Sequence, residues 1–148
     1  MRPSLRITLM PLLYLLAVGC GSSTRTYSVS IENRSAEPYM VWLTKNGPPM
    51  EQAWMSPEQI AVRGLERGAS VPGTLLPAGK SVSRTNVSGK FDSRSDAILR
   101  VYRGERKFAE LLAVQQGSSN RWDLVLAPGN NNVVIDQSGA VSLAPPAK

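Results

Sequence analysis

Histidine is absent from this chain of 148 residues, and Cys20 is its single cysteine. Without histidine the chain can form neither a Ser-His nor a Cys-His catalytic pair, and no His-ligated metal site. A single cysteine excludes an intramolecular disulfide and any zinc site that needs several thiolates. We therefore expect no resident metal or cofactor.

Acidic residues are also scarce, with 11 Asp and Glu against 17 Lys and Arg. Hydrolysis of a glycoside needs two carboxylates that face each other across a cleft, one of them with a raised pKa. Asp92 and Asp96 flank Arg94, a cation at the position where a calcium loop has its second ligand. We interpret these residues, together with Glu105 and Glu110, as solvated acids, and we expect the protein not to be an enzyme.

Long hydrophobic runs are missing as well. The longest one, residues 7–18, spans about 18 Å as a helix, which is short of the roughly 30 Å of a bilayer core. It follows Arg2 and Arg6 and ends at small residues, a pattern typical of a cleavable export signal.

Residues 16–20 read Leu-Ala-Val-Gly-Cys, and this stretch resembles the lipobox of bacterial lipoproteins. The resemblance covers residues 1–21 only, and Ala17 departs from the commoner leucine. It implies cleavage between Gly19 and Cys20, which removes residues 1–19, and attachment of diacylglyceryl and fatty acyl groups such as palmitate to Cys20. Gly21, rather than Asp, implies sorting to the outer membrane where the cell has one. The expected location is thus exported and held on a membrane of the cell envelope by lipid.

In the mature chain we expect a lipidated cysteine and short tether over residues 20–25, a single domain over 26–144 and a frayed tail over 145–148. Removing Arg2 and Arg6 lowers the net charge from +6 to +4. The expected partner is the bilayer, reached through Cys20, and an envelope protein or a glycan is a further candidate. Nucleic acid is not an expected partner.

Short segments with alternating polar and apolar residues, separated by Gly and Pro, predict a mainly β fold. We expect an antiparallel β-sandwich, immunoglobulin-like or transthyretin-like, with seven or eight short strands and one or two short helices. The strands are predicted at residues 26–33, 39–45, 71–76, 80–88, 96–103, 121–126, 132–136 and 140–143. A capping box at Ser56 and Gln59 predicts a helix over residues 57–63, and a second helix is predicted within 106–114. The predicted core is Tyr27, Val29, Ile31, Val41, Leu43, Leu99, Val101, Trp122, Leu124, Leu126, Val133, Ile135, Val141 and Leu143.

We expect the aromatic rings, Trp42 and Trp54 among them, to pack in the core and at its rim. If they are exposed instead, the candidate ligand contacts are Trp42, Trp54, Arg100 and Tyr102. Arg94, Arg100, Arg103, Arg106 and Lys107 form the densest basic stretch. Thioethers of Met40, Met50 and Met55 suit Cu(I), but we expect them to pack against the sandwich. The sequence therefore predicts a lipid-anchored, non-catalytic interaction or structural domain. The alternative is a glycan- or small-ligand-binding lipoprotein that uses these aromatic and arginine side chains.

Overall fold

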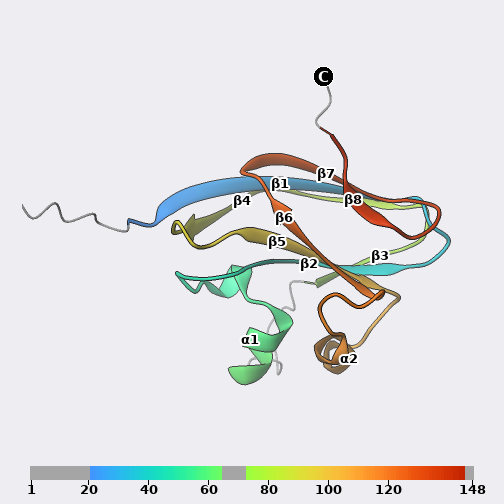
Figure 1. Ribbon diagram of the computed structural model, residues 1–148, viewed down its shortest axis with the longest axis horizontal. Coiled ribbons are helices and arrows are strands. Elements are labelled where there is room, and N and C mark those ends of the chain that lie inside the picture. The colour runs from blue at the N-terminus through green and yellow to red at the C-terminus, as the bar shows by residue number, and fades with distance from the viewer. Residues whose placement is uncertain (1–20, 65–72, 146–148) are drawn as a thin grey trace, which may run out of the picture.

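The computed structural model describes residues 21–64 and 73–145, and within them eight strands form two facing sheets of four (Figure 1). The strands are β1 (Ser23–Asn33), β2 (Tyr39–Lys45), β3 (Gly73–Leu76), β4 (Ser81–Phe91), β5 (Ala97–Arg103), β6 (Arg121–Leu126), β7 (Gly129–Ile135) and β8 (Val141–Leu143). The helices are η1 (Gln52–Trp54), α1 (Pro57–Val62) and α2 (Phe108–Ala113). The fold is the expected β-sandwich with short helices.

The first sheet has the order β4-β1-β7-β8, and the second has the order β3-β2-β5-β6. All neighbouring strands are antiparallel except β1 and β7, which are parallel. The parallel pair departs from the predicted antiparallel arrangement. It arises because the Pro-Gly turn after β6 carries the chain from the second sheet into the first, so that β7 joins beside β1.

Strand β1 alternates as predicted, with Tyr27, Val29 and Ile31 buried between the sheets. It begins at Ser23 rather than at residue 26, because Ser23 lies opposite Phe91 and the pairing with β4 continues along the strand. Residues 23–25, which were expected to belong to the tether over residues 20–25, are therefore part of β1.

Most of the predicted core is buried, but Leu143 is 43% exposed and its prediction is wrong. It belongs to β8, a short strand at the edge of the first sheet, where no further strand of the described chain covers it. Trp122, Leu124 and Val141 are partly buried against the core. The core also contains the rings of Trp54, which was expected to pack against the sandwich, and Phe91, which was not predicted; they meet edge to face with centroids 5.1 Å apart.

The helices cover the outer face of the second sheet (Figure 1). Helix α1 starts at the predicted capping box, in which the Gln59 backbone N–H donates to the Ser56 hydroxyl. A second, smaller core forms beneath the helices, composed of Trp42, Met55, Ile60, Tyr102 and Leu111. Three of the candidate ligand contacts, Trp42, Arg100 and Tyr102, therefore lie where these helices pack on the sheet.

Candidate functional site

Gly19 and Cys20, the predicted cleavage and lipidation positions, lie outside the described residues. Across residues 21–64 and 73–145, no helix has the length and apolar character needed to cross a bilayer. The described residues therefore bear on the proposed anchor in one respect, the position of Ser23, where the chain enters β1.

The structure buries the aromatic side chains that a ligand-binding role would need to be exposed. Trp42 and Trp54 are each 1% exposed and Tyr102 is 0% exposed. The Trp42 indole N–H donates to the Met55 carbonyl at 2.9 Å, and the Trp54 indole N–H donates to the Ser88 carbonyl at 3.1 Å. The expected packing of these rings is confirmed, and the alternative in which they are accessible to a ligand is contradicted, because the η1–α1 segment folds over β2 and places Trp54 between the sheets.

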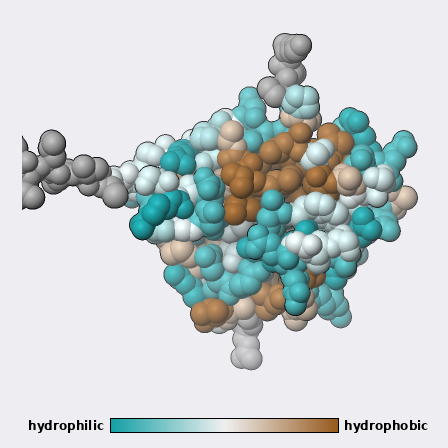
Figure 2. Space-filling model, in the orientation of Figure 1, coloured by the Kyte–Doolittle hydropathy of each residue, from teal (hydrophilic) through white to brown (hydrophobic). Residues whose placement is uncertain are grey.

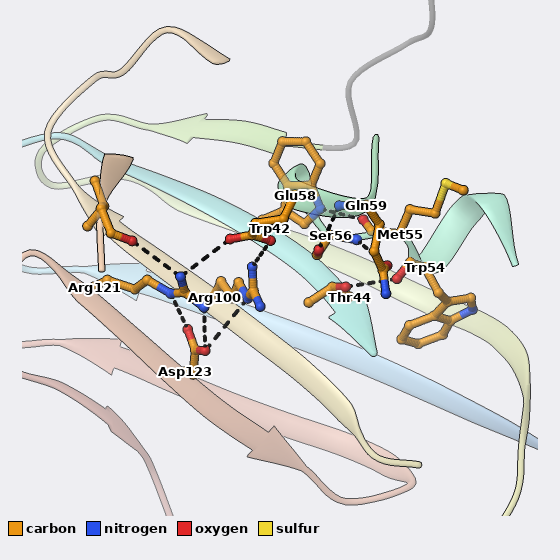
Figure 3. A network of polar contacts seen from close by, with 11 residues as sticks. Trp42, Thr44, Trp54, Met55, Ser56, Glu58, Gln59, Arg100, Arg121 and Asp123 are labelled. Atoms are coloured by element: carbon orange, nitrogen blue, oxygen red, sulfur yellow. Dashed lines mark hydrogen bonds and ion pairs between the residues drawn. The ribbon is translucent and has the colours of Figure 1, made fainter. Parts of the chain in front are cut away.

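Arg100, the fourth candidate, belongs to an ion-pair cluster with Glu58, Arg121 and Asp123 (Figure 3). Its guanidinium donates to the Glu58 carboxylate at 2.6 Å and lies 3.6 Å from the Asp123 carboxylate. Arg121 donates to both Asp123 oxygens, at 2.9 and 2.8 Å. The side chains of Arg121, Asp123 and Arg100 are only 7%, 12% and 14% exposed.

The ion-pair cluster balances its own charge and shifts the pKa values of Glu58 and Arg121 toward their ionised forms. Burial opposes ionisation of Glu58, but hydrogen bonds from Ser56 and the helix backbone, with the Arg100 guanidinium, hold its pKa below the ordinary value. The hydrogen bond to Asp123 raises the pKa of Arg121, although burial opposes this shift. Burial raises the pKa of the neighbouring Tyr102 phenol, whose hydroxyl has no hydrogen-bond partner within the described residues.

A general acid needs a carboxyl group with a raised pKa, and Glu58 has the opposite shift. The geometry instead indicates a structural role. Glu58 belongs to α1 while both arginines and Asp123 belong to β5 and β6, so the ion pairs attach the helix to the second sheet. Glu58, Arg121 and Asp123 were not predicted as site residues from the sequence. The available signal was the spacing of Arg121 and Asp123, which places both on one face of a strand.

The basic stretch predicted from residue 94 to 107 does not form one patch. Arg94 lies in the loop after β4, 3.5 Å from the Asp92 carboxylate. At the other end of β5, Arg103 lies 3.6 Å from Glu37 with its guanidinium over the Trp122 ring. The methionines are dispersed too, since Met40 and Met55 pack in the smaller core while Met50 is 43% exposed.

The sandwich has an apolar edge where β6 and β8 end the two sheets. Figure 2, in the orientation of Figure 1, shows a brown area where Figure 1 places these strands. Val125 is 57% and Leu143 is 43% exposed, and Trp122, Leu124 and Val141 are partly buried. Exposed apolar surface of this kind is common where proteins contact one another or a membrane.

The outer face of the first sheet is different, because small hydroxyl groups pair across its strands. The Thr26 and Ser88 hydroxyls are 2.9 Å apart, and the Ser83 hydroxyl donates to Ser30 at 3.1 Å. This face is polar and is lined mainly by hydroxyl and amide side chains.

No protein-family model matches the chain, and a search of curated proteins gives no match either. Arguments about function therefore depend on the residues themselves.

Proposed function

We propose that this chain is an exported lipoprotein that is lipidated at Cys20 and carries a non-catalytic β-sandwich as an interaction module on a membrane surface. The observation that supports this most is the position of the only thiol of the chain at the end of residues 16–20, close before strand β1. Buried acyl chains contribute about 0.8 kcal/mol per CH₂, and two or more chains give stable anchoring.

Two features support a non-catalytic role. The charged groups of the ion-pair cluster, three of which are nearly buried, neutralise one another and hold α1 on the second sheet. Within the described part of the chain, no group of three or more Asp, Glu, His or Cys side chains could hold a metal ion. The alternative, a glycan- or ligand-binding lipoprotein, gains no support from Trp42, Trp54 and Tyr102, whose rings are buried.

Mass spectrometry of the mature N-terminus tests the proposal, with Cys20→Ser and a Ser22→Ala control expressed alongside the unchanged chain in a bacterium. The unchanged protein and the control are expected to begin at a diacylated Cys20 and to fractionate with membranes. Cys20→Ser is expected to retain residues 1–19 and to carry no lipid mass. An unmodified Cys20 with the signal still attached would contradict the proposal.

A further inference from the structure

We propose that one end of the sandwich, formed by residues 46–50 and 92–96 and called here the anchor end, rests on the phospholipid headgroups of the bilayer. This inference rests on the proposed lipidation of Cys20. It adds to that proposal the surface that faces the membrane and the direction in which the domain points.

The short tether limits how the domain can be oriented relative to the bilayer. Only Gly21 and Ser22 separate Cys20 from Ser23, the first residue of β1. Three Cα–Cα steps span at most about 11 Å in extended chain. Pairing with β4 starts at Ser23 itself, opposite Phe91, so the strand supplies no further slack.

Contacts from β1 fix residues 92–96 beside this entry point. The Arg25 guanidinium donates to the carbonyls of Asp92 and Ser95 at 3.2 and 3.3 Å, and it lies 5.5 Å from the centroid of the Phe91 ring. The loop after β4 therefore cannot move away from the start of β1 without breaking these contacts.

Residues 46–50 are held to the same end by the loop after β4. The Asn46 backbone N–H donates to the Asp96 carbonyl at 3.1 Å, and the Asp96 N–H donates to the Asn46 side chain at 2.5 Å. Figure 1 shows both loops at the left of the molecule, where the chain enters β1. A bilayer that holds Cys20 thus lies next to these two loops.

The chemistry of the anchor end suits headgroups. Its carboxylates are largely neutralised within the protein, since Lys45 pairs with Glu51 and Arg94 with Asp92. Within the anchor end Arg94 is the one cation beside the anions Asp92 and Asp96, and adding the neighbouring residues Arg25, Lys45, Lys90 and Glu51 brings the local sum to one positive charge. The Arg94 side chain is 77% exposed and can reach a phosphate group.

The other loop provides apolar contact. Residues 47–50 read Gly-Pro-Pro-Met and carry no charged side chain, and Met50 is 43% exposed. An apolar side chain beside basic residues is the combination that favours the interfacial region of a bilayer.

The opposite end of the sandwich lies too far from Ser23 to share this contact. Ile135 lies opposite Asn33, ten strand positions beyond Ser23, which corresponds to roughly 33 Å along β1. The turn after Ile135, with the exposed Gln137, therefore projects away from the bilayer and is available to partners in the surrounding space.

Two variants, each with one added cysteine, test the orientation of the domain on the bilayer. Because lipidation occupies Cys20, a cysteine at Ser93→Cys or Gln137→Cys is the only free thiol, and both positions are exposed. Each purified lipidated variant is labelled with an environment-sensitive fluorophore. It is then placed in vesicles of phosphatidylethanolamine and phosphatidylglycerol containing a lipid with a spin label on its headgroup.

We expect quenching about threefold or more greater at position 93 than at position 137, because the two positions differ by roughly the length of β1. Equal quenching, or stronger quenching at position 137, would overturn the proposal. Fluorophore self-quenching at position 93 that disappears when unlabelled protein is added would assign this end to a second copy and overturn it as well. Mass spectrometry of the same samples distinguishes this failure from failure of the lipidation proposal, in which Cys20 carries no lipid.

Discussion

Gly89 in β4 leaves the space that the Trp54 indole fills. A Cβ atom added at Gly89 would lie 2.8 Å from Cε2 of Trp54 and 3.0 Å from Cε2 of Phe91. The contact with Trp54 is shorter than side chains tolerate, the contact with Phe91 is tighter than most, and both rings are buried. The absence of a Cβ atom at residue 89 therefore allows the Trp54 ring of η1 to pack in the core.

Gly89→Ala is expected to lower the free energy of unfolding by about 1–3 kcal/mol, because overpacking forces the Trp54 ring to shift. Urea unfolding measures the effect. In a Trp54→Leu background the same substitution is expected to cost much less, since the contacting ring is gone. Equal costs in the two backgrounds would show that Gly89 and Trp54 do not interact in this way.

The sequence predicts residues in regular strands better than residues in irregular segments. Alternation identified Tyr27, Val29 and Ile31 as core because each lies two positions from the next on one strand face. Trp54 was expected to pack against the sandwich, but its place between the sheets was not predicted, because it depends on η1 folding back onto β4, a long-range contact with no local periodicity. Arg100 was located on a strand, but its partners Glu58 and Asp123 come from other elements.

Elements with local signals were predicted closely. Strands β2 and β6 have the predicted bounds, and α1 begins at the predicted proline and its C-cap is Arg63, the predicted last residue. The first and fourth strands are longer than predicted because each extends along the other: Ser23–Thr24 and Lys90–Phe91 satisfy one another's backbone groups. Such mutual extension is a property of the pair and cannot be seen in either segment alone.

The capping box of α1 gives a prediction at this scale. Ser56→Ala is expected to destabilise the protein by about 1 kcal/mol, because the Gln59 backbone N–H loses its acceptor. The matched control is Ser93→Ala, an exposed loop serine, for which a change within about 0.5 kcal/mol is expected. Urea unfolding of the three proteins provides the comparison, and equal midpoints for all of them would contradict the capping role.

The attachment of α1 should also depend on pH. The pKa of Glu58 is lowered in the folded protein, so the folded state binds this proton less readily than the unfolded state does. The stabilisation is therefore present above the unfolded-state pKa of about 4.3 and is lost as the pH falls through the lower folded-state value.

Glu58→Gln is expected to flatten the decrease in the free energy of unfolding between about pH 5 and pH 3, because the substituted side chain does not titrate. Unfolding at a series of pH values measures this decrease. Glu105→Gln, an exposed carboxylate outside the ion-pair cluster, is the control and should retain the slope. Identical pH profiles for Glu58→Gln and the unchanged protein would contradict a stabilising role for the Glu58 carboxylate.

On the scale of the whole molecule, the first sheet depends on residues far apart in the chain. Strand β1 lies between β4 and β7, and its residue Tyr27 is opposite Gly129. Strand β7 also contributes Val133 and Ile135 to the main core. Non-local pairing of this kind is formed late, since it must first offset the entropy of closing a long loop.

A chain that ends at residue 127 is therefore expected to lose cooperative unfolding, whereas one that ends at residue 144 should retain it. Circular dichroism during urea titration distinguishes a sigmoidal transition from a gradual one. A sharp transition in the shorter chain would show that β1 to β6 form a stable unit without β7.

The parallel pairing of β1 with β7 has a consequence for biosynthesis. Until the ribosome has produced β7, β1 lacks its neighbour on one side, so the nascent polypeptide cannot complete the first sheet. The first sheet can therefore form only after translation has passed residue 135. If the chain is exported as proposed, this delay keeps it in the unfolded form that a secretory translocon requires.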